Sequence, residues 1–212
     1  MTSRADAAAE KRRKILAAAV HVFARQGFNA GRVSDIADQA GVAHGLVYHY
    51  FDSKDAILDE LFSDRWALLL QASRQVDSLD LSARDKLAKV AGFIVDSYRY
   101  DPDLMKVIIV EVTRAANTFG QTHLGEISEA YSMIARIVAE GQTAGEFRDD
   151  ISPDYGAMAF YGAVEQILTG WIFNLLPAED EDFERATEFV VETVCGGLGM
   201  PSRGRPATAA SD

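Results

Sequence analysis

The chain is short of the features that mark secreted, membrane-spanning and thiolate-bound metal proteins. Its one cysteine, Cys195, excludes an intramolecular disulfide and a cluster of thiolate ligands. The apolar run VIIV at 107–110 falls far short of the roughly 18 residues that cross a bilayer. The first 20 residues carry dispersed charges and lack a small-residue cleavage site after an apolar stretch. We therefore expect a cytoplasmic protein with no membrane partner.

Patterns that accompany catalysis or metal binding are also missing. The sequence has no paired His, Asp and Ser spacing, no GxGxxG or phosphate-binding loop, and no metal triad. His44 and His49 are five residues apart, about 140° around a helix, whereas zinc-binding pairs on a helix are spaced by about three or four. These absences predict a protein that is not an enzyme and uses no metal or other cofactor.

Charge is distributed unevenly along the chain, whose formal net charge is −11. Residues 1–54 contain eight basic and five acidic side chains, a net charge of +3, whereas the other 158 residues contain 13 basic and 27 acidic ones, a net charge of −14. A basic segment on an acidic body indicates an anionic partner that binds the N-terminal part alone. A charge of +3 over 54 residues also arises by chance, so the asymmetry raises this question without deciding it.

Helical periodicity dominates the chain, and the alternation typical of strands is scarce. Ile15, Ala19 and Phe23 form one stripe of a first helix, which Gly27 ends, and Gly41 separates two short helices. The expected helices are 11–26, 33–40, 44–51, 54–77, 83–100, 102–116, 121–144, 153–176 and 182–198. The sequence therefore predicts an all-α protein in which the long helix 54–77 connects two parts.

Residues 33–51 have the pattern of a helix-turn-helix, two short helices joined by a turn at Gly41. In the second helix, HGLVYHYF, Val47 and Phe51 are four residues apart and should pack inward, with Tyr50 at their edge. The other face of this helix carries polar and apolar side chains: His44, Leu46, Tyr48 and His49. Such a face suits contact with phosphates and base edges when a helix enters the major groove of DNA.

Residues 12–62 resemble the N-terminal domain of the TetR family of transcriptional regulators. VFARQGF, VSDIADQAGV, HGLVYHYF and DSKDAIL match the family pattern at the right spacing. The resemblance implies a three-helix helix-turn-helix DNA-binding domain, joined by a connector helix to a larger helical ligand-binding and dimerisation domain. The expected boundaries are a flexible N-terminal arm at 1–10, a DNA-binding domain at 11–56 with its motif at 32–51, a ligand-binding and dimerisation domain at 57–200, and a disordered tail at 201–212.

The resemblance assigns DNA contacts residue by residue. Tyr48 and Lys54 match positions that contact the DNA backbone, and Ser34 lies where a hydroxyl and free backbone N–H groups can meet a phosphate. Arg32 replaces a frequent threonine before the second helix and offers a charged phosphate contact instead. The positions most often near bases are His44, Gly45, Leu46 and His49, of which Leu46 stands where a small hydroxyl residue is common.

The acidic remainder of the chain should hold the dimer interface and the effector site. Small residues interleaved with aromatic ones in 153–176, together with 183–198, predict a homodimer interface, although an ordinary core helix has the same pattern. The residues expected around a lipophilic effector also suit a plain core: Phe93, Tyr98, Met105, Ile109, Thr113, Tyr131, Ile134, Phe160 and Gln166. The stretch GEFRDDISPDYGAMAFYGAVEQILTGW resembles acyl-CoA-responsive fatty-acid regulators of the family.

These patterns together predict a ligand-responsive transcriptional regulator. A homodimeric repressor would bind a palindromic operator in double-stranded DNA and be released by a small lipophilic molecule, with a fatty acyl-CoA as one candidate. Two alternatives stay open on the sequence. One is a protein-binding adaptor whose helix-turn-helix-like domain does not bind DNA, which Leu46 and the modest charge of +3 allow. The other is a non-catalytic small-molecule carrier.

Overall fold

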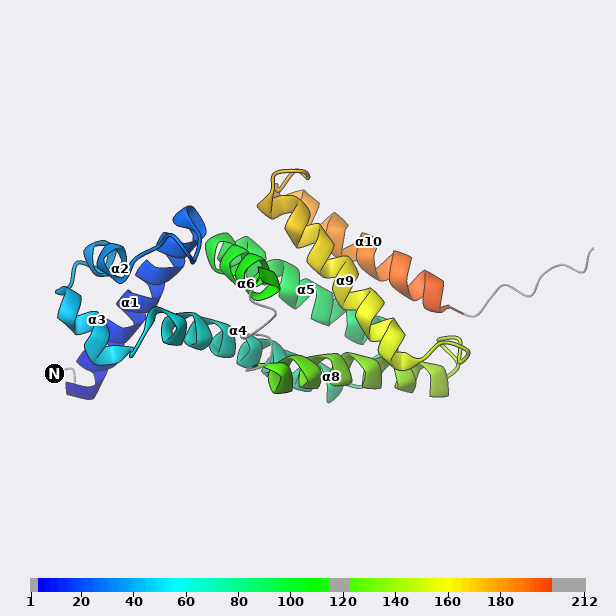
Figure 1. Cartoon of the computed structure of the whole chain (residues 1–212). Coiled ribbons are helices and arrows are strands. Elements are labelled where there is room, and N and C mark those ends of the chain that lie inside the picture. The colour runs from blue at the N-terminus through cyan, green and yellow to red at the C-terminus, as the bar shows by residue number, and fades with distance from the viewer. Residues whose placement is uncertain (1–3, 115–122, 200–212) are drawn as a thin grey trace, which may run out of the picture.

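Regular structure is helical throughout the part of the chain that the computed structural model describes, residues 4–114 and 123–199, apart from one isolated β-bridge between Phe147 and Gly199. The helices are α1 (Arg4–Gln26), α2 (Val33–Ala40), α3 (His44–Tyr50), α4 (Lys54–Asp77), α5 (Ala83–Tyr100), α6 (Pro102–Arg114), α8 (Leu124–Thr143), α9 (Pro153–Ile172) and α10 (Asp180–Leu198) (Figure 1). The all-α fold predicted from the sequence is confirmed.

Two helix boundaries differ by four or more residues from those expected. α1 begins at Arg4, so residues 4–10, which the sequence analysis assigned to a flexible arm, are helical because alanine, the strongest helix former, fills 7–9. α9 ends at Ile172 instead of 176, because the chain turns at Asn174, which has a φ of +55°. The expected tail at 201–212 lies outside the described residues.

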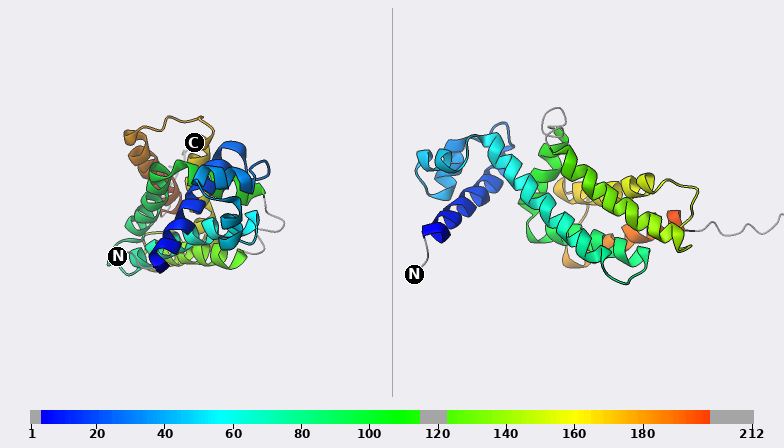
Figure 2. Two further views of the ribbon diagram at one scale, coloured as in Figure 1. Left: turned by 90° about the vertical axis from the view of Figure 1, so that its left-hand side faces the viewer. Right: turned by 90° about the horizontal axis from the view of Figure 1, so that it is seen from below.

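The helices form two bundles joined by α4. α1, α2 and α3 make a small bundle at one end of the molecule, and α5, α6, α8, α9 and α10 make the larger one (Figure 1). α4 starts beside α3 and continues along the larger bundle, where it packs on α5 and α8; the view from below in Figure 2 shows this course. The expected connector helix is therefore present and contacts both bundles, mainly the larger one.

The small bundle has its own core, built on α1. Ile15, Ala19 and Phe23 of α1 are at most 2% exposed, as are Ile36 of α2 and Val47 of α3. The sequence stripe on the first helix therefore faces the helix-turn-helix, as its spacing predicts.

Polar contacts attach the small bundle to the rest of the chain. Arg12 of α1 forms an ion pair with Glu60 of α4. The Nδ1 atom of His21 on α1 lies 3.7 Å from Oδ2 of Asp103 on α6. Because exposed ion pairs contribute little, about 0–1 kcal/mol each, these contacts position the bundle without fixing it firmly.

Neither a membrane span nor a metal cluster is found in the described part. None of its helices combines the length and the apolarity needed to cross a bilayer. Among the side chains that the structure describes there is also no group of three or more His, Cys, Asp or Glu that could hold a metal ion.

Two glycines of α8 provide a matched test of the packing in the larger bundle. A Cβ atom at Gly141 would lie 2.7 Å from the Cβ atom of Ala83 and would also overlap the ring of Phe147, whereas a Cβ atom at Gly125 would meet nothing within 4 Å. We expect Gly141→Ala to lower the free energy of unfolding by about 1–3 kcal/mol, because it overpacks the contact. Gly125→Ala should raise it by up to about 1 kcal/mol through helix propensity. Urea denaturation followed by circular dichroism measures both, and equal shifts of the two midpoints would contradict the close approach at Gly141.

Candidate nucleic-acid interface and ligand cavity

Two buried side chains fix the orientation of α3. Val47 is 1% and Phe51 4% exposed, and the guanidinium of Arg12 lies over the ring of Phe51 at 4.7 Å. Because these groups hold one side of α3 against the rest of the small bundle, the opposite side faces solvent. That side carries four of the residues expected to contact DNA, of which Leu46 is half-buried and the others are exposed: His44, Gly45, Leu46 and His49.

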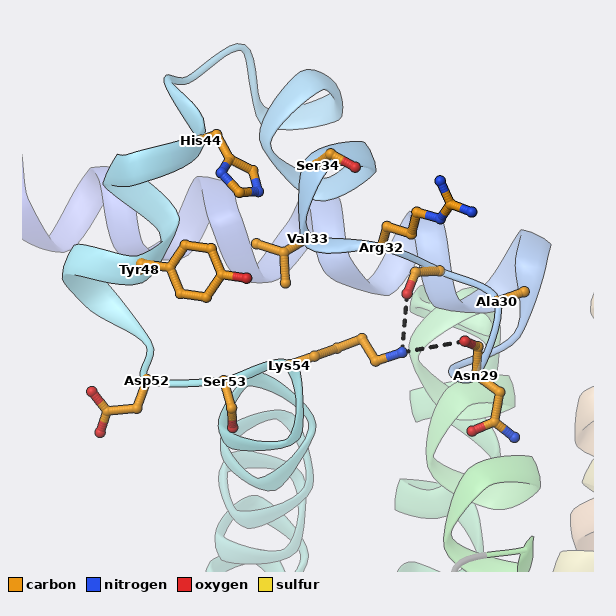
Figure 3. A pocket seen from close by; sticks show the side chains of 11 residues that line it. Asn29, Ala30, Arg32, Val33, Ser34, His44, Tyr48, Asp52, Ser53 and Lys54 are labelled. Atoms are coloured by element: carbon orange, nitrogen blue, oxygen red, sulfur yellow. Dashed lines mark hydrogen bonds between the residues drawn. The ribbon is translucent and has the colours of Figure 1, made fainter.

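A groove of about 810 Å³ runs beside α3. It is formed by the α1–α2 loop, the start of α2, one side of α3 and the α3–α4 connection (Figure 3). Tyr48 points its hydroxyl into the groove, and the ring of His44 packs edge-on against Tyr48 at a centroid distance of 5.2 Å. Five of the eight residues expected to contact DNA line the groove: Arg32, Ser34, His44, Tyr48 and Lys54.

The N-terminus of α2 opens onto this groove. The backbone N–H of Arg32 donates to the carboxylate of Asp35 at 3.1 Å, while the guanidinium of Arg32 is exposed and points away from Lys54 (Figure 3). Ser34 lies in the first turn of α2 and is exposed. An exposed cation, a hydroxyl and the positive end of a helix together suit a phosphate.

Lys54 has a different environment from the one the sequence suggested. Its ammonium donates to the carbonyl oxygens of Phe28 at 2.7 Å, Gly31 at 3.0 Å and Asn29 at 3.4 Å, two of which Figure 3 shows. It also lies 4.4 Å from the centroid of the Phe28 ring. The three donors of Lys54 are thus directed at the loop before α2, so in this structure Lys54 fixes the shape of the groove.

Gly45 is a position where packing within the chain does not require glycine. It lies in the first turn of α3, is exposed, and an added Cβ atom would meet nothing within 4 Å. Gly41 differs, because it ends α2 in the left-handed conformation with a φ of +65°, which side chains disfavour. The absence of a side chain at Gly45 therefore exposes the backbone of α3 to solvent and creates no space inside the protein.

The larger bundle contains a cavity of about 200 Å³ between α4, α6, α8 and α9. The ring of Trp66 stacks on that of Tyr161 at 6.1 Å between centroids, and Tyr131 meets Tyr161 edge-on at 5.2 Å. The cavity wall is aromatic and aliphatic with one carboxyl group: Phe62, Trp66, Ile108, Ile109, Ile127, Tyr131, Tyr161 and Glu165.

Burial shifts the ionisable groups of this wall towards their neutral forms. It raises the pKa of Tyr161 and of Tyr131, and the charge of Glu165 adds to both shifts. Burial also raises the pKa of the Glu165 carboxyl. A wall of neutral hydroxyl groups and apolar rings suits a lipophilic ligand that has few polar atoms.

The residues expected to surround a ligand are only partly brought together. Ile109 and Tyr131 line the cavity. Tyr98, Met105, Ile134 and Phe160 are buried without lining it, and Phe93 packs beneath Arg65. Gln166 is exposed on α9, whereas its neighbour Glu165 lines the cavity, and the side chain of Thr113 lies outside the described part.

Six cavity residues were not predicted from the sequence: Phe62, Trp66, Ile108, Ile127, Tyr161 and Glu165. Phe62 and Trp66 are four residues apart on the connector helix, so their spacing places them on one face of it. No sequence signal distinguishes an inward residue that faces packed atoms from one that faces a cavity.

Comparison with known proteins gives matches over both bundles. Residues 15–61 match the model for bacterial regulatory proteins of the tetR family, and residues 84–194 match the C-terminal domain of proteins like the tetracyclin repressor. The chain is 32% identical over 151 residues to the HTH-type transcriptional repressor NicS of Pseudomonas putida, covering 70% of this chain and 71% of that protein.

Relatives with a role in fatty-acid metabolism also match. The fatty acid metabolism regulator protein of Bacillus subtilis is 28% identical over 186 residues, which cover 87% of this chain and 94% of that protein. The crystal structure of the transcriptional regulator FadR from Bacillus subtilis in complex with stearoyl-CoA superposes with a TM-score of 0.78 at 26% identity, covering 88% of this chain and 98% of that one.

The contacts of Lys54 can be tested without any ligand. We expect Lys54→Met to lower the free energy of unfolding by about 1–3 kcal/mol, because it removes a charged donor from three carbonyl groups that are partly shielded from water. Arg32→Met is the matched control and should change stability by less than about 0.5 kcal/mol, because its side chain is exposed. Guanidinium denaturation of both variants provides the measurement. A Lys54→Met variant as stable as the control would show that Lys54 is not structural.

Proposed function

Because the chain belongs to the TetR family of bacterial regulatory proteins, we propose that it is a homodimeric transcriptional repressor that binds a palindromic operator and is released by a lipophilic effector. Members of this family are regulators and not enzymes. A repressor that binds DNA in a bacterium acts in the cytoplasm, which is the location we propose. We assign the DNA-binding domain to residues up to 56 and the ligand-binding and dimerisation domain to the residues from 57 onwards.

The observation that carries the DNA-binding proposal is the exposed side of α3 beside the groove. Arg32, Ser34 and Tyr48 offer a guanidinium and two hydroxyl groups to phosphates along this groove. The exposed tip of α3 presents the groups that would face bases: His44, Gly45, Leu46 and His49. Lys54 supports the site by holding the α1–α2 loop, and its ammonium must leave those carbonyls before it can meet a phosphate.

The proposed dimer interface is an exposed stripe on α9 and α10. Tyr155 is 76% and Met158 54% exposed on α9, and Phe189 is 61% exposed on α10. Three glycines on the same two helices have open space where a Cβ atom would be: Gly162, Gly196 and Gly197. Residues 155, 158, 162 and 166 recur at helical spacing on one side of α9, so they form one surface. Exposed aromatic side chains beside small residues favour close packing against a second copy.

The effector proposal rests on the position of α4. Phe62 and Trp66 of α4 line the cavity, and the same helix begins at Lys54 beside α3. A ligand that separates α4 from α6, α8 or α9 would therefore shift the recognition helices of the dimer relative to each other. It lowers DNA affinity only if it binds the shifted arrangement more tightly. The regulators of fatty-acid metabolism among the relatives make fatty acyl-CoA molecules the first effectors to test.

Substitution of Gly45 tests DNA binding independently of folding. Gly45→Ala should reduce operator affinity about tenfold or more, because a methyl group at the tip of α3 would displace base contacts worth about 1–3 kcal/mol each. The free energy of unfolding should stay constant or rise by up to about 1 kcal/mol, since alanine favours the helix. Fluorescence anisotropy with duplexes from the upstream region of the gene, over a series of salt concentrations, measures the affinity. Gly125→Ala, an open glycine on α8, is the matched control.

The same titration decides between the two broad functions. Binding by the wild-type protein should weaken steeply with salt, because phosphate contacts release counterions. A wild-type protein without any salt-dependent DNA binding would favour the protein-binding adaptor. If Gly45→Ala and the wild type bind the operator with equal affinity, the surface that reads the bases does not lie at the tip of α3.

Phe189 tests the dimer. Phe189→Glu should weaken dimerisation about 30-fold or more, because it places a charge where a central aromatic side chain is expected to be desolvated. Leu68→Glu is the matched control: Leu68 is 53% exposed on α4, outside the stripe, and its substitution should leave the dimer intact. Sedimentation equilibrium measures the dissociation constants. A dimer that persists in the Phe189→Glu variant, or that Leu68→Glu disrupts to the same extent, places the interface elsewhere.

A further inference from the structure

The connector helix carries one cation in the interior of the protein, Arg65. This residue is 9% exposed on α4, and burial lowers the pKa of its guanidinium. Its Nε atom donates to the sulfur of Met105 at 3.3 Å, and its guanidinium lies over the ring of Phe93 at 5.0 Å. Among the side chains that the structure describes, those of residues 5–110 and 123–199, no carboxylate forms an ion pair with it; Asp101 acts on it only through longer-range attraction.

These contacts are poor compensation for a buried charge. A thioether sulfur is a weak acceptor, and an aromatic face attracts a cation less strongly than a carboxylate does. Charged side chains in protein interiors are normally paired, because the loss of hydration is costly. Neither packing nor an ion pair therefore explains why an arginine occupies this position.

The guanidinium and the cavity are adjacent. Trp66, the residue that follows Arg65, lines the cavity, and its indole Nε1 is buried without a hydrogen-bond partner among the described residues. Tyr161 also lines the cavity and interacts electrostatically with Arg65. A buried N–H donor therefore lines the cavity, and a buried cation lies beside two residues of a wall whose one carboxyl group is Glu165. Among the described side chains neither donor is paired with a carboxylate.

We propose that Arg65 is the counter-ion for an anionic group of the effector, with Trp66 donating a hydrogen bond to the same end of the ligand. The effector is then an amphiphile with an apolar body in the aromatic cavity and one anionic end at Arg65. This inference rests on the proposed function, because it takes the cavity between α4, α6, α8 and α9 as the effector site. At about 200 Å³ the cavity lies below the roughly 300–1,000 Å³ of pockets for drug-sized ligands, which favours a short apolar body.

The test compares three eight-carbon probes on the full-length protein. Octanoate carries a carboxylate, octanoyl-CoA carries phosphates, and 1-octanol is neutral. Thermal unfolding and calorimetry are measured for the wild type, for Arg65→Met, which keeps an unbranched apolar stem and removes the charged guanidinium, and for Arg65→Lys, which keeps the charge. Operator binding is measured in parallel by anisotropy.

Octanoate or octanoyl-CoA should raise the melting temperature of the wild type, and octanol should do so less. A response to octanoate assigns the anionic group to a carboxylate, and a response to octanoyl-CoA alone assigns it to a phosphate. Arg65→Met should raise the dissociation constant of the anionic probe tenfold or more, and Arg65→Lys should raise it less. Without a probe, Arg65→Met should melt at or above the temperature of the wild type, because an uncompensated buried charge has been removed.

Three results would overturn the proposal. One is an anionic probe that binds Arg65→Met as tightly as the wild type. Another is the absence of any preference for anionic over neutral probes, which includes no response to any of them. The last is a ligand-free Arg65→Met variant that melts well below the wild type, because Arg65 would then be a structural cation. A wild-type protein that does not bind the operator even without a probe would instead refute the proposed function and leave the probe comparison to decide the role of Arg65.

Discussion

The candidate DNA-binding surface depends on the anchoring of a very short helix. α3 has seven residues, well below the roughly 12–15 that an isolated helix needs to persist in water, so its structure must come from tertiary contacts. Val47 and Phe51 supply these contacts through their burial in the core, and Arg12 of α1 covers the ring of Phe51. With one side of α3 fixed, every other side chain on it receives a defined direction. The groove, the exposed tip and the start of α4 all follow from this anchor.

α4 links that anchor to the larger bundle. Its first residue, Lys54, holds the loop that leads into α2. Phe62 and Trp66, about two and three turns further on, line the cavity. Glu60, which lies between Lys54 and Phe62, pairs with Arg12 of α1. One rigid helix therefore touches the DNA-binding bundle on one side and the ligand cavity on the other. Such a shared element is the physical basis on which binding at one site can change the affinity at the other.

Residues that are locally unfavourable stand at the proposed sites. Glycine at position 45 weakens a helix that is already marginal, although the fold has room for a side chain there. Arginine at position 65 is buried, and no described carboxylate forms an ion pair with it. Native sequences break local rules mainly where function requires it, at a cost in stability. Both positions therefore indicate a partner outside the chain, which we propose to be DNA at α3 and an anionic ligand at α4.

The sequence by itself determined the helices, the helix-turn-helix and the inward face of α3, because period and capping are local properties that Val47, Phe51 and Gly41 express directly. It also placed His44 and Tyr48 on an outward face.

Only the tertiary structure decided which inward residues meet a cavity. It grouped Ile109 and Tyr131 with Phe62, Trp66 and Glu165. It left Phe160 in the packed core and exposed Gln166. It likewise turned Lys54 towards the carbonyls of residues 28–31. Helical periodicity gives the direction in which a side chain leaves its own helix. A cavity or a long-range hydrogen bond depends instead on how several helices pack against one another.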